Sequence, residues 1–159
     1  MIFTILSALA FTVGTGQPIL TTNGYGKVYF GMHLDAAEAA VGEKDVAAGE
    51  SGVETCRYVS FASLPNVQFM AENNVITRAD ASRGVENALH ISIDGALSNV
   101  TAKYPAVRIT AHKYDADGRY VIFEGADRKT AIVFEASGGK ITKVRAGPEP
   151  SVEYVEGCL

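Results

Sequence analysis

The chain has 159 residues, of which 47% are hydrophobic and 20% are charged, and its formal net charge is −4. This composition is typical of a globular protein, and the length suits one domain with a substantial core. Binding to a phosphate backbone needs clustered Lys and Arg, which this mildly acidic chain lacks, so we expect no nucleic-acid partner.

The N-terminal segment predicts export. Ile2 to Val13 form an apolar stretch, and the first charged side chain is Lys27. Small residues precede a cleavage site after Ala10, and Gly14-Thr15-Gly16 offers a second site. We therefore assign residues 1–16 to a signal peptide and expect a periplasmic or secreted chain. The alternative is a buried first strand, and in either case about 12 apolar residues are too few to span a bilayer.

The two cysteines, Cys56 and Cys158, predict a disulfide if the chain is exported. Such a bridge closes a loop of about 100 residues, for which chain entropy gives roughly 4–5 kcal/mol. Two separate buried thiols are the alternative for a cytosolic chain. No Cys-x-x-Cys pair is present in the sequence, so we expect no zinc site.

The first half of the mature chain, residues 17–83, is predicted to contain one helix among β-strands. Leu34, Ala37 and Val41 fall on one helical face, and Gly42 is placed to end the helix. Residues 43–54 are expected to form a loop. Asn73-Asn74 is expected to form the turn of the last hairpin. Strands are expected at residues 27–30, 55–61, 67–71 and 75–81.

The second half, residues 84–159, repeats this order. Ile91 and Ile93 predict a short strand, and Leu97, Val100 and Tyr104 predict a helix that ends before the next proline. Strands are expected at residues 107–114, 119–123, 130–135, 140–146 and 152–155, with turns at residues 115–118 and 137–139.

The two halves are also similar in sequence. Residues 57–61 read Arg-Tyr-Val-Ser-Phe and residues 119–123 read Arg-Tyr-Val-Ile-Phe, an offset of 62 residues. Residues 69–81 and 134–146 share Phe, Ile-Thr and Ala at an offset of 65. Such self-similarity indicates a duplicated unit. We therefore predict an α+β fold of two tandem repeats packed as one domain. The repeats are expected to form a curved antiparallel sheet with helices on one face.

The first helix also carries a family motif. Gly31-Met32, followed by Ala37 and Val41-Gly42, resembles the Gly-Met-Thr…Val…Leu-Gly motif of the SmpA/OmlA family. That family includes the small lipoprotein of the outer-membrane β-barrel assembly machinery. Its fold is shared by the β-lactamase inhibitor proteins, which are secreted tandem-repeat proteins with a concave antiparallel sheet. The ending Val152–Cys158 also resembles exported bacterial proteins that pair a mid-chain Cys with a C-terminal Glu-Gly-Cys. The resemblance implies export and this fold, whereas no inhibitor contact residue aligns to a motif here.

The sequence offers little for catalysis or metal binding. The three histidines, His33, His90 and His112, lack metal-binding spacing. Asp115-x-Asp117-Gly118 begins like a calcium loop, but Arg119 occupies the fifth position, so a hairpin turn is expected. The sequence contains no nucleophile elbow. We therefore expect no enzyme activity, no metal and no cofactor.

The recurrent aromatic strands suggest a binding surface. In each Arg-Tyr-Val-x-Phe strand, Tyr and Phe are three residues apart, so they should point to opposite faces of the sheet. Exposed Tyr and Arg commonly anchor interfaces. The candidate binding residues are Arg57, Tyr58, Arg119 and Tyr120. The alternative is that a helix or loop covers this face.

The resulting hypothesis is an exported, non-enzymatic module that binds a protein partner, with enzyme inhibition as one form of that function. An envelope structural or assembly factor is the alternative. Binding of a small molecule between the repeats is a further alternative.

Overall fold

The computed structural model describes residues 16–47 and 55–158. They form two antiparallel sheets and two short helices, which confirms a predominantly β version of the predicted α+β class. Apart from Gly16, the predicted signal peptide lies outside the described residues. The small sheet comprises β1 (Leu20–Thr21), β2 (Gly24–Tyr25) and β3 (Val28–Tyr29), and the helices are α1 (Leu34–Val41) and α2 (Leu97–Lys103).

The large sheet contains eight strands in the order β4-β5-β6-β7-β11-β10-β9-β8. β4 to β7 come from the first half of the chain and β8 to β11 from the second. The halves meet at the antiparallel pair β7–β11, where Asp80 lies opposite Arg145. The strands are β4 (Val46–Ala47), β5 (Cys56–Ser60), β6 (Val67–Glu72), β7 (Val75–Ala81), β8 (Arg108–Ala111), β9 (Arg119–Glu124), β10 (Thr130–Ser137) and β11 (Lys140–Pro148).

The predicted hairpin turns are confirmed by their backbone conformation. Asn73 and Asn74 have φ values of 50° and 61°, and Gly138 and Gly139 have values of 56° and 76°. A two-residue hairpin loop needs this left-handed conformation, which Asn and Gly adopt at the lowest steric cost. These turns connect β6 to β7 and β10 to β11.

Each helix follows a segment that is hydrogen-bonded to the last strand of its own half. The amide of Leu34 donates to the carbonyl of Asn74 at 2.8 Å, and the amide of Leu97 donates to that of Gly139 at 2.9 Å. The helices therefore begin beside the β6–β7 and β10–β11 turns. Gly42 ends α1 as predicted, with φ of 87° and its amide bonded to the Glu38 carbonyl.

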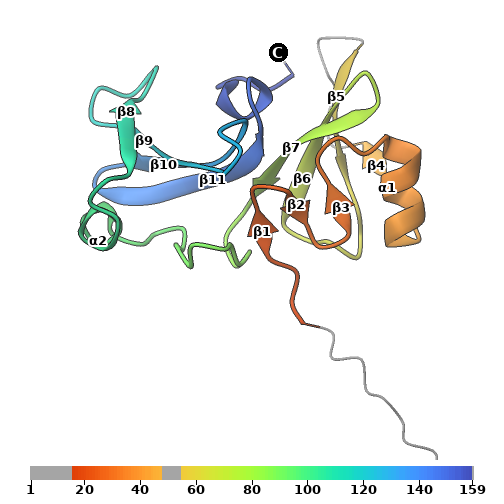
Figure 1. Cartoon of the computed structure of the whole chain (residues 1–159), viewed down its shortest axis with the longest axis horizontal. Helices are drawn as coiled ribbons and strands as arrows, with labels where there is room; N and C mark the ends of the chain where they lie inside the picture. The colour runs from red at the N-terminus through yellow and green to blue at the C-terminus, as the bar shows by residue number, and fades with distance from the viewer. Residues whose placement is uncertain (1–15, 48–54, 159) are drawn as a thin grey trace, which may run out of the picture.

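The two faces of the large sheet are covered differently. On one face, the main core buries side chains from the small sheet and both helices, including Val28, Leu34 and Val100. On the opposite face lie two smaller apolar clusters, one around Val152 and one around the Cys56–Cys158 disulfide. In Figure 1, α2 and β1 lie below the sheet and the C-terminal segment lies above it.

Two expected strands are wrong. The C-terminal segment forms a 3₁₀ turn, η1 (Ser151–Glu153), and its carbonyl groups accept hydrogen bonds from the side chains of Arg78 and Arg145 rather than from a neighbouring strand. Residues 91–93 are not a strand either. There the buried Asn87 side chain donates to the Ile91 carbonyl at 2.7 Å and accepts from its amide at 3.3 Å, which holds the segment as an irregular linker. The expected loop at 43–54 contains β4, and residues 48–54 lie outside the described part of the chain.

Candidate functional site

The sheet face opposite the helices is crossed by residues 149–158, which we call the C-terminal strap. It begins at the end of β11 and reaches β5, where Cys158 forms a disulfide with Cys56. The predicted disulfide is therefore confirmed, with a Cα–Cα distance of 5.3 Å across a sequence separation of 102 residues. Buried Val152 anchors the middle of the strap. The sequence did not determine whether this face of the sheet is exposed or covered, and the strap covers it along this path.

Arg78, on β7, holds the strap through its main chain. Its guanidinium donates to the carbonyl oxygens of Tyr154 at 2.6 Å and Ser151 at 3.4 Å. It also donates to both carboxylate oxygens of Asp80, at 2.7 and 2.8 Å, and to the Tyr58 hydroxyl at 2.9 Å. All five N–H groups are used, as a buried guanidinium requires. Arg78 is therefore a structural residue.

Arg145, on β11, fixes the strap a second time. Its Nε donates to the Val152 carbonyl at 2.6 Å, and its guanidinium forms a buried ion pair with Glu135 of β10. Glu135 also lies 3.3 Å from the Lys143 ammonium and 3.5 Å from Nε2 of His112. These contacts form a polar cluster around Glu135 on the strap side of β10 and β11.

The surroundings of Glu135 predict acid sensitivity. Burial favours its neutral form, but Arg145, assisted by Lys143, outweighs burial and holds the pKa of Glu135 below its usual range. When the pH is above the ordinary glutamate pKa of about 4.3, such a carboxylate stabilises the fold. That contribution disappears as the pH falls through the pKa that Glu135 has in the folded protein. We therefore expect the free energy of unfolding to decrease as the pH is lowered below about 5.

Urea denaturation at a series of pH values across this range measures that loss. In Glu135→Gln, the slope of the free energy of unfolding against pH should be smaller. Some slope should persist in the variant, because hydrogen bonds also lower the pKa of Asp115 and Asp127. An unchanged slope in Glu135→Gln would contradict the assignment.

The two candidate tyrosines lie under the strap. Tyr120 is 8% exposed, and its ring stacks on that of His112 at a centroid distance of 4.6 Å. Tyr58 is half-buried against the disulfide, and burial raises the pKa of its hydroxyl. Phe61 and Phe123 pack on the main core, which confirms that Tyr and Phe of each strand point to opposite faces. The tyrosines therefore contribute to packing rather than to an exposed patch.

The candidate arginines are half-exposed and already paired. Arg57 contacts the Asp45 carboxylate at 3.2 Å, and Arg119 donates to the carbonyl oxygens of Ala116 and Gly118. The first lies on β5 and the second on β9, with four strands between them in the sheet. The structure therefore does not bring the four candidate binding residues together into one surface.

The histidines are also separate. His33 precedes α1 without a side-chain capping bond, His90 is exposed, and His112 lies beside Tyr120. Within residues 16–47 and 55–158, no group of three or more His, Cys, Asp or Glu side chains could hold a metal ion. The Asp115–Gly118 segment is a turn, closed by a hydrogen bond of 3.0 Å from the Gly118 amide to the Asp115 carbonyl.

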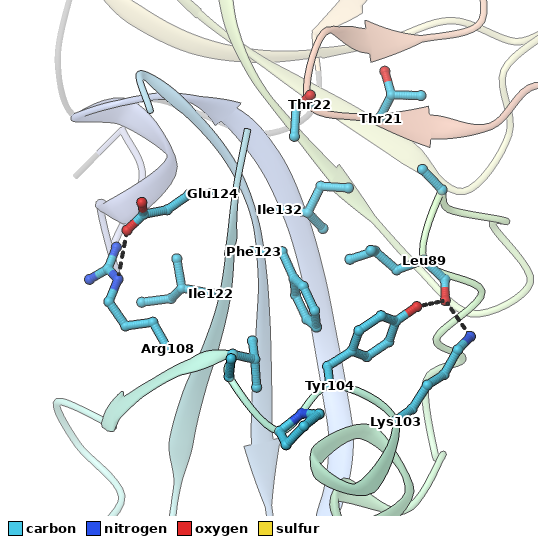
Figure 2. A pocket seen from close by; sticks show the side chains of 14 residues that line it. Thr21, Thr22, Leu89, Lys103, Tyr104, Arg108, Ile122, Phe123, Glu124 and Ile132 are labelled. Atoms are coloured by element: carbon cyan, nitrogen blue, oxygen red, sulfur yellow. Dashed lines mark hydrogen bonds and ion pairs between the residues drawn. The ribbon is translucent and has the colours of Figure 1, made fainter. Parts of the chain in front are cut away.

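A concave site lies mainly on the helix-bearing side, and we call it the inter-half cleft. Its lining also includes Ile122 and Arg108, whose side chains lie on the strap face. The cleft has a volume of about 710 Å³. It opens between the β1–β2 hairpin of the first half and β8, β9 and α2 of the second (Figure 2). Small-ligand sites commonly have 300–1,000 Å³ and mostly apolar walls. The lining residues are Thr21, Thr22, Ala88, Leu89, Lys103, Tyr104, Pro105, Ala106, Val107, Arg108, Ile122, Phe123, Glu124 and Ile132.

The wall of the cleft consists of aromatic side chains packed edge to face. Tyr104 meets Phe123 edge to face at a centroid distance of 5.0 Å, and Phe123 meets Phe134 in the same way at 5.8 Å. The Tyr104 and Phe123 rings are only half-buried, and Leu89 beside them is half-buried too. The cleft therefore presents accessible apolar surface on side chains that pack against one another.

Polar groups lie along the rim. The Tyr104 hydroxyl and the Lys103 ammonium both donate to the Leu89 carbonyl, at 3.2 and 3.4 Å. At the other end, Nε of Arg108 lies 3.1 Å from the Glu124 carboxylate. Figure 2 shows the contacts to the Leu89 carbonyl at one end of the apolar wall and the Arg108–Glu124 pair at the other. The titratable rim groups are thus engaged with each other or with the backbone.

The sequence raised binding between the repeats as an alternative, but it did not identify the residues that line the cleft. The cleft depends on the path of linker residues 84–96 and on the Thr21-Thr22 turn facing β10, neither of which periodicity reveals.

No described helix is long and apolar enough to cross a bilayer. No protein-family model matches the chain, and neither curated protein sequences nor solved structures gave a match.

Proposed function

We propose that this protein is a non-enzymatic binding module that receives an apolar group of a protein partner in the inter-half cleft. The observation behind the proposal is the cleft itself, in which half-buried Leu89, Tyr104 and Phe123 line a hollow of about 710 Å³. Apolar surface held rigidly in a concave site binds at a low entropic cost. Both halves contribute to the lining, so the complete site requires the whole chain.

A binding role fits the rim better than catalysis does. A nucleophile and a base within hydrogen-bonding reach of one another are the usual signature of acid–base or covalent catalysis. Along this cleft, the Lys103 and Tyr104 side chains bond to a backbone carbonyl, and Arg108 pairs with Glu124. Each of these side chains is already paired, and that of Arg108 also lies near Glu153 of the strap.

We further propose export, because a disulfide between Cys56 and Cys158 is typical of oxidising compartments. A periplasmic or secreted partner follows, and inhibition of an enzyme in that compartment is one form of the function. The resemblance of the first helix to the SmpA/OmlA family favours an envelope assembly role as the alternative. The cleft volume suits a small molecule equally well, and the test below separates that outcome.

We infer that the halves are copies of one unit. The helix-entry hydrogen bonds of Leu34 and Leu97 support this inference. So do the two sheet irregularities, which fall 65 residues apart, after Met70 and after Glu135. Asp80 and Arg145 are also 65 residues apart and lie opposite each other, as expected at a local two-fold axis relating two copies.

Ala106→Trp tests the proposed function by filling the cleft with an indole ring. Ala106 is an exposed cleft residue, so the fold should tolerate the change. We expect the variant to capture a partner from envelope and secreted fractions at least about tenfold more weakly than the wild type, because the site is occupied. Quantitative mass spectrometry of proteins retained on immobilised full-length chain gives the measurement.

Ala39→Trp is the matched control, because Ala39 is exposed on α1, away from the cleft. Equal capture by all three proteins would contradict the proposal. A ligand retained by wild type and control that proves to be a small molecule would replace the protein partner with the small-molecule alternative.

A further inference from the structure

Besides the inter-half cleft, the region around β8 has a second feature, which is the outer edge of this strand. β8 is the last strand in the order, so its outer side has no neighbouring strand among the described residues. On the inner side, the His112 amide donates to the Gly118 carbonyl at 3.1 Å, in the register of the β8–β9 ladder. Hydrogen-bonded and non-hydrogen-bonded pairs alternate in an antiparallel ladder. The backbone groups of Arg108 and Thr110 therefore face β9, and those of Ile109 and Ala111 face outward.

The side chains of β8 leave that edge accessible. All four residues of the strand are exposed, and Ile109 is 40% exposed. Ile109 pairs with Val121, a main-core residue, so its side chain lies on the helix-bearing face of the sheet. β8 also begins at the cleft, because Val107 and Arg108 line it. The edge and the cleft are thus one continuous surface.

The charges near β8 do not protect its edge. Proteins often block an open edge with a charged side chain or a proline. Here the guanidinium of Arg108 lies 3.1 Å from Glu124, 3.6 Å from Glu153 and 4.0 Å from Glu149, so it is turned toward the strap face. Lys113 is likewise drawn to Glu156 at 3.4 Å. Neither cation lies across the outward amide and carbonyl groups.

We propose that β8 accepts an extended segment of the partner protein as an additional strand, with one apolar side chain of that segment seated in the inter-half cleft. The inference rests on the proposed function and specifies its partner as an extended peptide. Strand addition draws affinity from main-chain hydrogen bonds and specificity from pockets that receive alternate side chains. Ile109 and Ala111 supply the main-chain groups, and the Phe123–Tyr104 wall supplies the pocket.

The test uses dodecapeptides selected from a random phage-displayed library on the full-length protein. Fluorescence anisotropy then measures the affinity of fluorescein-labelled synthetic copies. Ile109→Pro removes one outward N–H without removing a β8–β9 bond, because proline is tolerated at such an edge position. We expect it to weaken binding roughly tenfold to a hundredfold. Ile109→Thr keeps the N–H, and its effect should be smaller.

Methylation of single peptide amides provides a readout that does not depend on folding of a variant. Strand addition predicts that binding is lost for methylation at every second residue over the paired segment and is retained at the residues between. Uniform tolerance of methylation, or equal affinity of Ile109→Pro and wild type, would overturn the inference. Failure to select any peptide would overturn it as well.

The same variants separate this inference from the proposed function. Loss of peptide binding in Ala106→Trp without loss in Ile109→Pro would retain the cleft and reject strand addition. Loss in Ile109→Pro without loss in Ala106→Trp would reject the seating of a side chain in the cleft, and the proposed function with it.

Discussion

Removal of the disulfide should reduce the free energy of unfolding by about 4–5 kcal/mol, because the bridge closes a loop of about 100 residues in the unfolded chain. Cys56→Ala/Cys158→Ala is the appropriate double variant, since it leaves no free thiol. Single domains are commonly stable by only 5–15 kcal/mol, so this loss should bring the protein close to unfolding. Urea denaturation of the variant and of wild type measures it.

The strap should also become less firmly held in that variant. Arg78 and Arg145 would still bond its carbonyl groups, so the strap should open at its Cys158 end first. Limited proteolysis followed by mass measurement should then detect cleavage within residues 149–158. Reduced wild-type protein is the control and should match the double variant. A loss of less than about 1 kcal/mol would contradict the chain-entropy account.

Arg145→Met should cost about 3–5 kcal/mol, because it leaves the Glu135 carboxylate buried without its main partner. The ion pair is almost fully enclosed, with side-chain exposures of 5% for Arg145 and 7% for Glu135. The variant also loses the hydrogen bond from Arg145 to the Val152 carbonyl, which holds the strap. Equilibrium denaturation near neutral pH gives the measurement.

The double variant Glu135→Met/Arg145→Met should recover much of that loss, because it leaves no unpaired charge. Methionine suits the position of Glu135, since Met70 occupies the corresponding position 65 residues earlier and is buried. Lys143→Met is the matched control. Its ammonium also contacts Glu135, but it is 71% exposed, so its removal should cost less than about 1 kcal/mol. Equal effects of Arg145→Met and Lys143→Met would refute the distinction between buried and exposed pairs.

Local patterns accounted for most of the secondary structure. The apolar spacing of Leu34, Ala37 and Val41 with Gly42 behind it defined α1, and Asn73-Asn74 and Gly138-Gly139 defined two hairpins. These features depend on residues close together in the chain, so propensity and turn chemistry are sufficient. The cysteine pairing was also accessible, because an exported chain with two cysteines has one intramolecular pairing available.

Only the tertiary structure decided which segments cover each face of the large sheet. Alternation placed Tyr58 and Tyr120 on the face opposite the phenylalanines, but it could not show that the strap covers them. The expected last strand is replaced by η1, and the arginine–carbonyl bonds that hold this segment join residues up to 76 positions apart. The inter-half cleft likewise joins Thr21 to Ile132. Periodicity in one strand determines which face a side chain occupies, whereas coverage of that face depends on distant segments whose contacts leave no local pattern.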